Sequence, residues 1–124
     1  MHTDNNGAGV AERLLTVQML GSTGAITTIV YESGALSELR HLLDLLAPVE
    51  GKYAHNARWG DGNGFSHVRS ALLKTSLSVP VVNGELVLGT RQQVVALNLD
   101  DRERRRELVA VLVGSGVMWV PVSE

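Results

Sequence analysis

Asn83 and Gly84 lie between two short apolar runs, 77–82 and 85–88, and this pattern constrains the fold more than any other. Both residues tolerate the positive φ angles of a type I′ turn, which joins the two strands of an antiparallel hairpin. Other apolar runs also have the length of strands: 14–20, 25–31, 93–99, 108–113 and, as a candidate last strand, 117–122. The sequence therefore predicts a mostly antiparallel sheet.

Leucines with helical spacing predict a helix that begins at Ala35 and ends before Pro48. They occupy positions 36, 39, 42, 43 and 46, whereas His41 falls on the polar face, where we expect it to be exposed. A second, shorter helix is predicted over 66–74, with Ser66 as its N-cap. Because strands and helices do not alternate, the pattern indicates an α+β domain with helices on one side of the sheet.

The length indicates one domain over 1–124, with residues 1–9 as a flexible lead-in. The chain has no cysteine, which excludes disulfides and thiolate metal sites and is typical of a reducing compartment. The net charge is −2 and no apolar run is long enough to span a bilayer, so we expect a cytoplasmic protein that binds neither nucleic acid nor membrane. The arginines within 102–106 are interleaved with glutamates and are interpreted as a self-paired surface segment.

The stretch 50–64 is polar and rich in glycine, yet its aromatic residues disfavour disorder, so we interpret it as a functional loop. His55 and His67 lie on either side of a carboxylate and an amide, Asp61 and Asn63. This set of groups suits a divalent metal, a phosphate or a polar substrate. His67 also follows the predicted helix start, where backbone N–H groups favour anions. The spacing matches no metal motif, and the alternative that both histidines only bond loop carbonyls stays open.

A second polar segment, GTRQ at 89–92, lies between two predicted strands. Its glycine indicates a bulge or a close backbone approach. Arg91 is suited to hold a phosphate, and the alternative of an ordinary surface residue stays open. The chain has no GxGxxG, Walker, GxSxG or HExxH motif, which argues against the common nucleotide-binding and hydrolase classes.

Several stretches together resemble the YjbQ-like family, whose members are often described as secondary thiamine-phosphate synthases. They are YAHNARWGDGNGFSHVRSALL, SLSVPVVNGELVLGTRQQVVAL and the arginine-rich segment with LVAVLVG. Upstream, GSTGAITTIVYESG is similar to the family's HTSAxLTINE segment. The resemblance extends over roughly residues 14–114 and is most specific in the second half, where several motifs occur in the family's order.

The resemblance implies a β-sandwich-like core of mostly antiparallel strands with two helices, assembled as a homotrimer with pockets near the subunit boundaries. It implies an activity that joins a pyrimidine diphosphate to a thiazole phosphate, with a divalent metal, Mg²⁺ or Zn²⁺, at the diphosphate. The residues that it assigns to catalysis and to the metal are His55, His67 and Asp61. Those that it assigns to the substrate are Asn63, Thr90 and Gln92, and Arg91 joins them as a group suited to phosphate.

The chain also departs from the family. The family's histidine falls on Gly21 and its glutamate on Val30, although Glu32 has the same strand parity as Val30 and is a candidate substitute. Arg91 and Lys74 stand where the family has tryptophan and glycine, and two added cations favour an anionic ligand. The family has a further strand and helix before the segment similar to HTSAxLTINE, and we expect either that this domain lacks an edge strand or that the true start lies upstream of Met1.

These departures support two alternatives to the enzyme. One is a non-catalytic trimeric binding protein for a phosphate-bearing metabolite, and the other is a structural trimer without a ligand.

Overall fold

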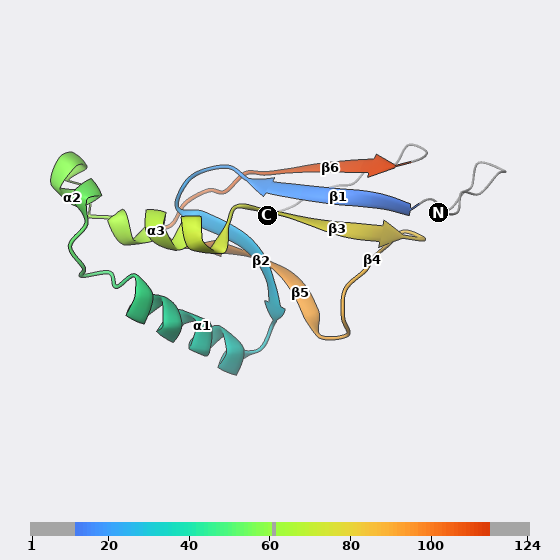
Figure 1. Ribbon diagram of the computed structural model, residues 1–124, viewed down its shortest axis with the longest axis horizontal. Coiled ribbons are helices and arrows are strands. Elements are labelled where there is room, and N and C mark those ends of the chain that lie inside the picture. The colour runs from blue at the N-terminus through green and yellow to red at the C-terminus, as the bar shows by residue number, and fades with distance from the viewer. Residues whose placement is uncertain (1–11, 61, 115–124) are drawn as a thin grey trace.

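The computed structural model describes residues 12–60 and 62–114, arranged as shown in Figure 1. The elements are β1 (Glu12–Met19), β2 (Gly24–Val30), α1 (Ser33–Leu46), α2 (Ala54–Trp59), α3 (Gly64–Leu73), β3 (Ser76–Val82), β4 (Glu85–Leu86), β5 (Gln92–Asn98) and β6 (Leu108–Gly114). All the strand pairs between them are antiparallel, so the predicted α+β class is confirmed. The lead-in predicted at 1–9 and the strand predicted at 117–122 lie outside the described residues.

One sheet has four strands in the order β4-β3-β1-β6, with β1 between β3 and β6. Leu15 pairs with Val79 on one side and with Leu112 on the other. These three side chains point to the more covered face of the sheet, and the next residues along each strand point to the more exposed face. This alternation follows from the two-residue period of a strand.

The hairpin predicted at Asn83 and Gly84 is confirmed. Their φ angles are 54° and 79°, and the turn pairs Val82 with Glu85. β4 is shorter than the predicted 85–88, because it ends at Leu86 and the chain then leaves the sheet.

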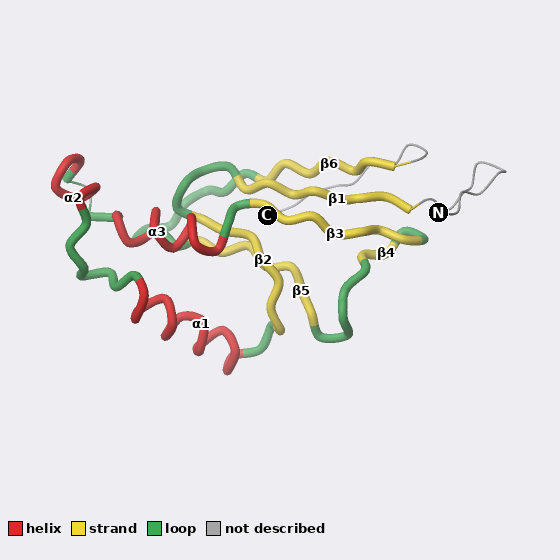
Figure 2. The backbone as a smooth tube through the Cα atoms, in the orientation of Figure 1, coloured by secondary structure: helices red, strands yellow, loops and turns green. Residues whose placement is uncertain are grey.

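A second, two-stranded sheet is formed by β2 and β5, and it curves away from the four-stranded sheet (Figure 2). The segment 20–23 carries the chain from the end of β1 into β2. Buried apolar side chains lie on strands of both sheets: Met19, Ala25, Ile26, Val79 and Val81. Others lie on or next to the helices, Leu43, Ala47 and Phe65, so the core includes the helical end of the chain as well as the sheets.

The helices lie together at one end of the molecule, beside β2 and far from the β3–β4 hairpin (Figure 1). On α1, Leu43 is buried, but Leu42, Leu45 and Leu46 are 50%, 67% and 60% exposed. The leucine face predicted for this helix is therefore only partly covered within this chain, whereas His41 is exposed as predicted. Among the described residues, no helix is long and apolar enough to cross a bilayer.

Glu32 is the N-cap of α1. Its carboxylate accepts hydrogen bonds from the backbone N–H groups of Gly34 and Ala35, at 2.9 and 2.6 Å. Glu32, the candidate substitute for the family glutamate, thus serves as a helix cap in this structure. This cap also explains why the helix begins at Ser33, two residues before the predicted start.

A third helix, α2, lies inside the stretch predicted to be a loop, and α3 begins at Gly64 instead of position 66. Asn63 is the N-cap of α3. Ser66, the predicted N-cap, lies inside the helix, and its hydroxyl donates to the carbonyl oxygen of Asn63 at 2.6 Å. The sequence did not predict α2 or the true start of α3, because the glycines at 60, 62 and 64 are each typical of a break in a helix.

We predict that Gly24→Ala lowers the free energy of unfolding by roughly 1–3 kcal/mol. The added Cβ would overlap Sδ of Met19, which is fully buried, and would lie 3.1 Å from the carbonyl oxygen of Leu97. Urea unfolding followed by circular dichroism measures the change. Gly89→Ala is the control, because its Cβ would come no closer than 3.6 Å to another residue, Gln92. Equal midpoints for the two variants would contradict the packing at Gly24.

Candidate functional site

The helices that carry the predicted site residues, α2 and α3, approach each other closely at Gly64. A Cβ at this position would lie 2.5 Å from Cβ of Tyr53, so only glycine fits. The N–H of Gly64 donates to Oδ1 of Asn56 at 2.8 Å. α2 ends at Gly60, whose left-handed backbone has a φ of 72°. The glycines therefore fold the chain back so that α2 lies against the start of α3.

This fold-back brings His55 of α2 and His67 of α3 together. Their ring centroids are 4.3 Å apart and the ring planes are inclined at 59°. Nε2 of His55 is 3.1 Å from Oδ1 of Asn63, and Nδ1 of His67 is 3.2 Å from the carbonyl oxygen of Ser22. Two of the three residues predicted for catalysis and one predicted for the substrate thus share one small region.

The hydrogen bonds orient the two imidazole rings in a definite way. An amide or carbonyl oxygen can only accept, so Nε2 of His55 and Nδ1 of His67 carry the protons in these contacts. In the neutral rings, Nδ1 of His55 and Nε2 of His67 then hold lone pairs. Such a nitrogen can ligate a metal or accept a proton, and a carbonyl oxygen behind the ring is the usual support of a metal-binding histidine.

A complete metal-binding set is not seen in the described ranges, where no three histidine or carboxylate side chains gather. The third predicted ligand, Asp61, lies outside the described residues. Within the described residues, His55 and His67 thus provide two neighbouring imidazole rings, and imidazole is a ligand that Zn²⁺ accepts.

Hydrogen bonds fasten α3 to the rest of the chain. The hydroxyl of Ser70 donates to the carbonyl oxygen of Gly24 at 2.5 Å. Arg69 donates from Nε to the carbonyl oxygen of Ala47 and from Nη2 to Asp44, both at 2.9 Å. Because Arg69 and Ser70 are buried, these bonds are costly to lose and hold the helix in one position.

A hollow of about 320 Å³ lies between α3 and the segment that joins β1 to β2, and we call it the His67 hollow. From α3 it is lined by His67, Ser70, Ala71 and Lys74, which recur at three- and four-residue spacing. Gly21, Ser22 and Thr75 complete it. Ser22 and Ser70 were not predicted; for Ser70, helical spacing from His67 was the available signal.

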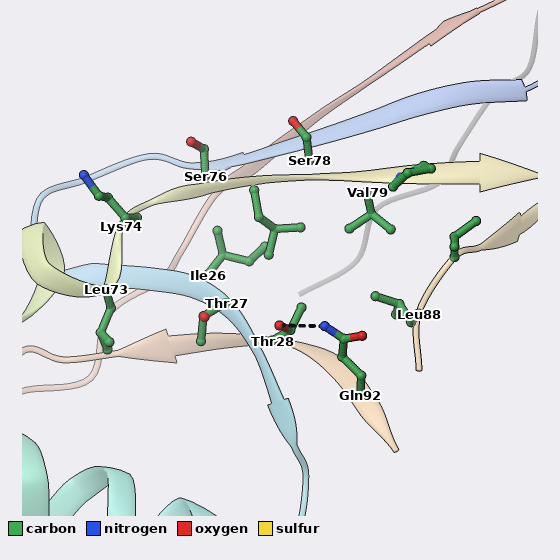
Figure 3. Close-up of a pocket in the computed structure, with 13 residues that line it drawn as sticks. Ile26, Thr27, Thr28, Leu73, Lys74, Ser76, Ser78, Val79, Leu88 and Gln92 are labelled. Atoms are coloured by element: carbon green, nitrogen blue, oxygen red, sulfur yellow. Dashed lines mark hydrogen bonds between the residues drawn. The ribbon is translucent and has the colours of Figure 1, made fainter. Parts of the chain in front are cut away.

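Gln92 lines a different hollow of about 330 Å³ between the two sheets, which we call the Gln92 hollow (Figure 3). Its Nε2 donates to Oγ1 of Thr28 at 3.2 Å, and its Oε1 accepts from the N–H of Gly89 at 2.9 Å. Thr90 and Arg91 lie in the exposed turn just before Gln92.

The structure does not bring this turn to the two histidines within one chain. Gln92 pairs with Val30 at the end of β2, whereas Ser22, which contacts His67, precedes the start of β2. Six residues of strand separate the two ends of β2, a distance of roughly 20 Å. The predicted substrate residues are therefore divided: Asn63 lies beside His55, whereas Gln92, with Thr90 and Arg91 just before it, lies at the other end of β2. Gly21 lines the His67 hollow, and Val30 lies at the Gln92 end.

Arg106 is a residue whose role the sequence did not indicate. Its Nη2 donates to the carbonyl oxygen and to Oγ1 of Thr23, at 2.9 and 2.8 Å, and also to Oδ1 of Asn98. The interpretation of the arginine run as a self-paired surface is wrong for Arg106, which is partly buried against the segment joining β1 to β2. The interpretation suits Arg104 better, since its side chain forms an ion pair with Asp100 at 2.6 Å.

Asp100 lies in the same region as Arg104, Arg106 and Thr23. Burial alone would raise its pKa, but hydrogen bonds from Asp101, Arg104 and Thr23 outweigh burial and hold the pKa of Asp100 well below its usual range. The ionised carboxylate is therefore the form that stabilises the folded chain.

Comparison with known proteins relates the sequence to one family. The model for "UPF0047 protein YjbQ-like" matches residues 5–115. A UPF0047 protein of Methanothermobacter thermautotrophicus is 39% identical over 104 residues, which are 84% of this chain and 71% of that protein. A UPF0047 protein of Synechocystis is 32% identical over 110 residues, which are 86% of this chain and 74% of that protein.

Solved structures share the fold. A YbjQ-like protein of unknown function from Sulfolobus solfataricus superposes with a TM-score of 0.75 at 23% identity, over 87% of this chain and 75% of that one. A hypothetical protein from Aeropyrum pernix gives 0.72 at 25% identity, over 90% and 80%. The fold described above is thus one that experimental structures also contain.

We predict that Asp100→Asn destabilises the chain near neutral pH and that the loss disappears in acid. The folded pKa of Asp100 is lower than the unfolded value of 3.8, so its contribution is complete above about pH 5 and is lost as the pH falls toward the folded pKa. Urea unfolding of both proteins between pH 6 and pH 2 measures the difference. Parallel curves over this range would contradict the assignment.

Proposed function

Because the chain belongs to the UPF0047 family of YjbQ-like proteins, we propose that it binds a phosphorylated small molecule at His55 and His67 together with a divalent metal ion. The observation that supports this most is the pair of imidazole rings 4.3 Å apart, each oriented by an oxygen acceptor. A histidine ring that only filled space would not need an oxygen acceptor for its N–H group, although it could donate to one.

The donor set fits a metal. Nδ1 of His55 and Nε2 of His67 would hold it, and Asp61 keeps the role of third ligand that the sequence predicts. Such an ion would neutralise the charge of a phosphate or diphosphate and polarise its oxygens. The chain's own residues position the rings, because Asn63 holds one and the carbonyl of Ser22 holds the other.

As an enzyme, the protein would transfer a pyrimidine methylene group from diphosphate to a thiazole phosphate, the activity implied by its resemblance to secondary thiamine-phosphate synthases. That reaction releases pyrophosphate, and cationic groups near the leaving oxygens lower its barrier. Lys74 lines the His67 hollow and is the described cation suited to this task.

A second candidate function is binding without catalysis. It is favoured by Gly21, which contributes no side chain to the His67 hollow, and by Val30, which is apolar at the end of β2. Binding would still use the two histidines, but it would need no group to move a proton.

We also propose a cytoplasmic homotrimer that covers the outer face of the four-stranded sheet. On β6, the edge strand of this sheet in the described chain, Val109, Val111 and Val113 are 47%, 51% and 64% exposed. A row of apolar side chains at a sheet edge is a surface that a monomer seldom leaves open.

For the metal site, we predict that wild-type protein binds one equivalent of Zn²⁺ in isothermal titration and that His55→Ala and His67→Ala each weaken binding at least about tenfold, because each removes one of few ligands. His41→Ala is the control, because His41 is exposed on α1. Identical titrations for the wild type and the double histidine variant would contradict the site. If the metal binds, formation of thiamine phosphate in the presence of Mg²⁺ separates the enzyme from the binding protein.

For the trimer, Val111→Lys is expected to yield a monomer in light scattering, because a charge would be buried in the interface. Gln93→Lys, an exposed position on the other sheet, should leave the mass unchanged. A wild-type monomer would rule the trimer out.

A further inference from the structure

We propose that Lys74 anchors the phosphate or diphosphate group of the ligand in the His67 hollow. The inference rests on the proposed function for the identity of the ligand, but its evidence is separate. It comes from the backbone of Lys74, from the direction of its side chain and from the groups around it.

The backbone of Lys74 has a conformation that suits glycine. Its φ and ψ angles are 79° and 155°, a region that residues with a Cβ rarely occupy. The N–H of Lys74 donates to the carbonyl oxygen of Ser70 at 2.8 Å, and its own carbonyl oxygen accepts from the N–H of Ile26 at 3.1 Å. The turn from α3 into β3 therefore requires this conformation, and glycine would adopt it with less strain. A lysine kept under strain indicates a task for its side chain.

Lys74 lies where the two hollows adjoin, since it lines both of them. Figure 3 shows its ammonium end directed away from Gln92 and toward the side on which the chain passes from β1 to β2. That is the side of Gly21 and Ser22, which line the His67 hollow with it. Among residues 12–60 and 62–114, no carboxylate forms an ion pair with this ammonium group.

The lining of the His67 hollow suits an anion. None of its seven residues is acidic, and its ionisable groups are His67 and Lys74. Oγ1 of Thr75 accepts a hydrogen bond from Nε2 of Gln18 at 3.1 Å, so its hydroxyl proton is available to an acceptor in the hollow. Behind the wall, Nη1 of Arg106 would lie 3.2 Å from a Cβ on Gly21, so a second full positive charge adjoins the site.

This chemistry points to a compact polyanion. A lysine ammonium is a flexible point charge with three donors, which suits phosphate oxygens without fixing one geometry. The hydroxyl of Thr75 beside it can donate a further hydrogen bond to a phosphate or diphosphate. A phosphate at Lys74 would also leave the Gln92 hollow next to it for the organic part of the ligand.

The test is isothermal titration with inorganic pyrophosphate and with orthophosphate, in buffer that contains EDTA, so that a metal site cannot contribute. We expect Lys74→Gln to weaken pyrophosphate binding at least about tenfold, Lys74→Arg to retain most of it, and Lys52→Gln, an exposed lysine elsewhere, to bind like the wild type. Lys74→Gly should lose binding and at the same time raise the melting temperature by about 5 °C, because the strain is relieved.

Either of two results would overturn the proposal: no binding of either anion by the wild type, or equal binding by wild type and Lys74→Gln. The metal titration is independent of this experiment. Loss of anion binding in Lys74→Gln with an unchanged Zn²⁺ titration supports the anchor, and it does so even if the histidines prove to bind no metal.

Discussion

The hydrogen bonds between Arg106 and Thr23 fix the segment between β1 and β2, and the rest of the structure depends on the position of this segment. Thr23 lies where the chain leaves one sheet for the other, and the guanidinium of Arg106 binds both its carbonyl and its hydroxyl. The N–H of Leu99 donates to the same carbonyl at 2.9 Å. These bonds fix the segment that carries Ser22 and Gly24, and those two residues in turn fix His67 and Ser70 of α3. A contact between distant parts of the chain thereby sets the geometry of the candidate site.

Directional polar contacts, more than apolar packing, determine where α3 lies. Ser66, Arg69 and Ser70 are all buried, and each has a backbone acceptor at a definite distance. A buried polar group without its partner is costly, so such a network allows few alternative positions. On α1, by contrast, two of the five leucines of the predicted face, Leu42 and Leu46, remain exposed within this chain. The bonds of Arg69 run to Ala47 and Asp44, so they fasten α3 to the end of α1.

The two hollows contain residues that the family resemblance assigned to a site. One holds His67 with its hydroxyl-bearing neighbours, the other holds Gln92, and Lys74 borders both. A phosphorylated heterocycle has the same two parts, a charged end and an organic end. Gly21 and Val30 bring no polar side chain to these two places, whereas Lys74 brings a cation to the border of the hollows. The balance of these changes decides between an enzyme and a binding protein.

The sequence by itself determined what depends on neighbours in the chain. The hairpin at Asn83 and Gly84, the strand periods and the leucine helix each arise from a few adjacent residues, and all are present in the structure. It also identified His55 and His67 as candidates, because their side-chain chemistry is visible in a single residue. Only the tertiary structure decided that the histidines meet, that Gln92 lies at the other end of β2, that Glu32 caps a helix and that Arg106 is covered. Those outcomes depend on which distant segments share a surface, and that is set by how the two sheets meet and how α3 lies against β2, which no local pattern encodes.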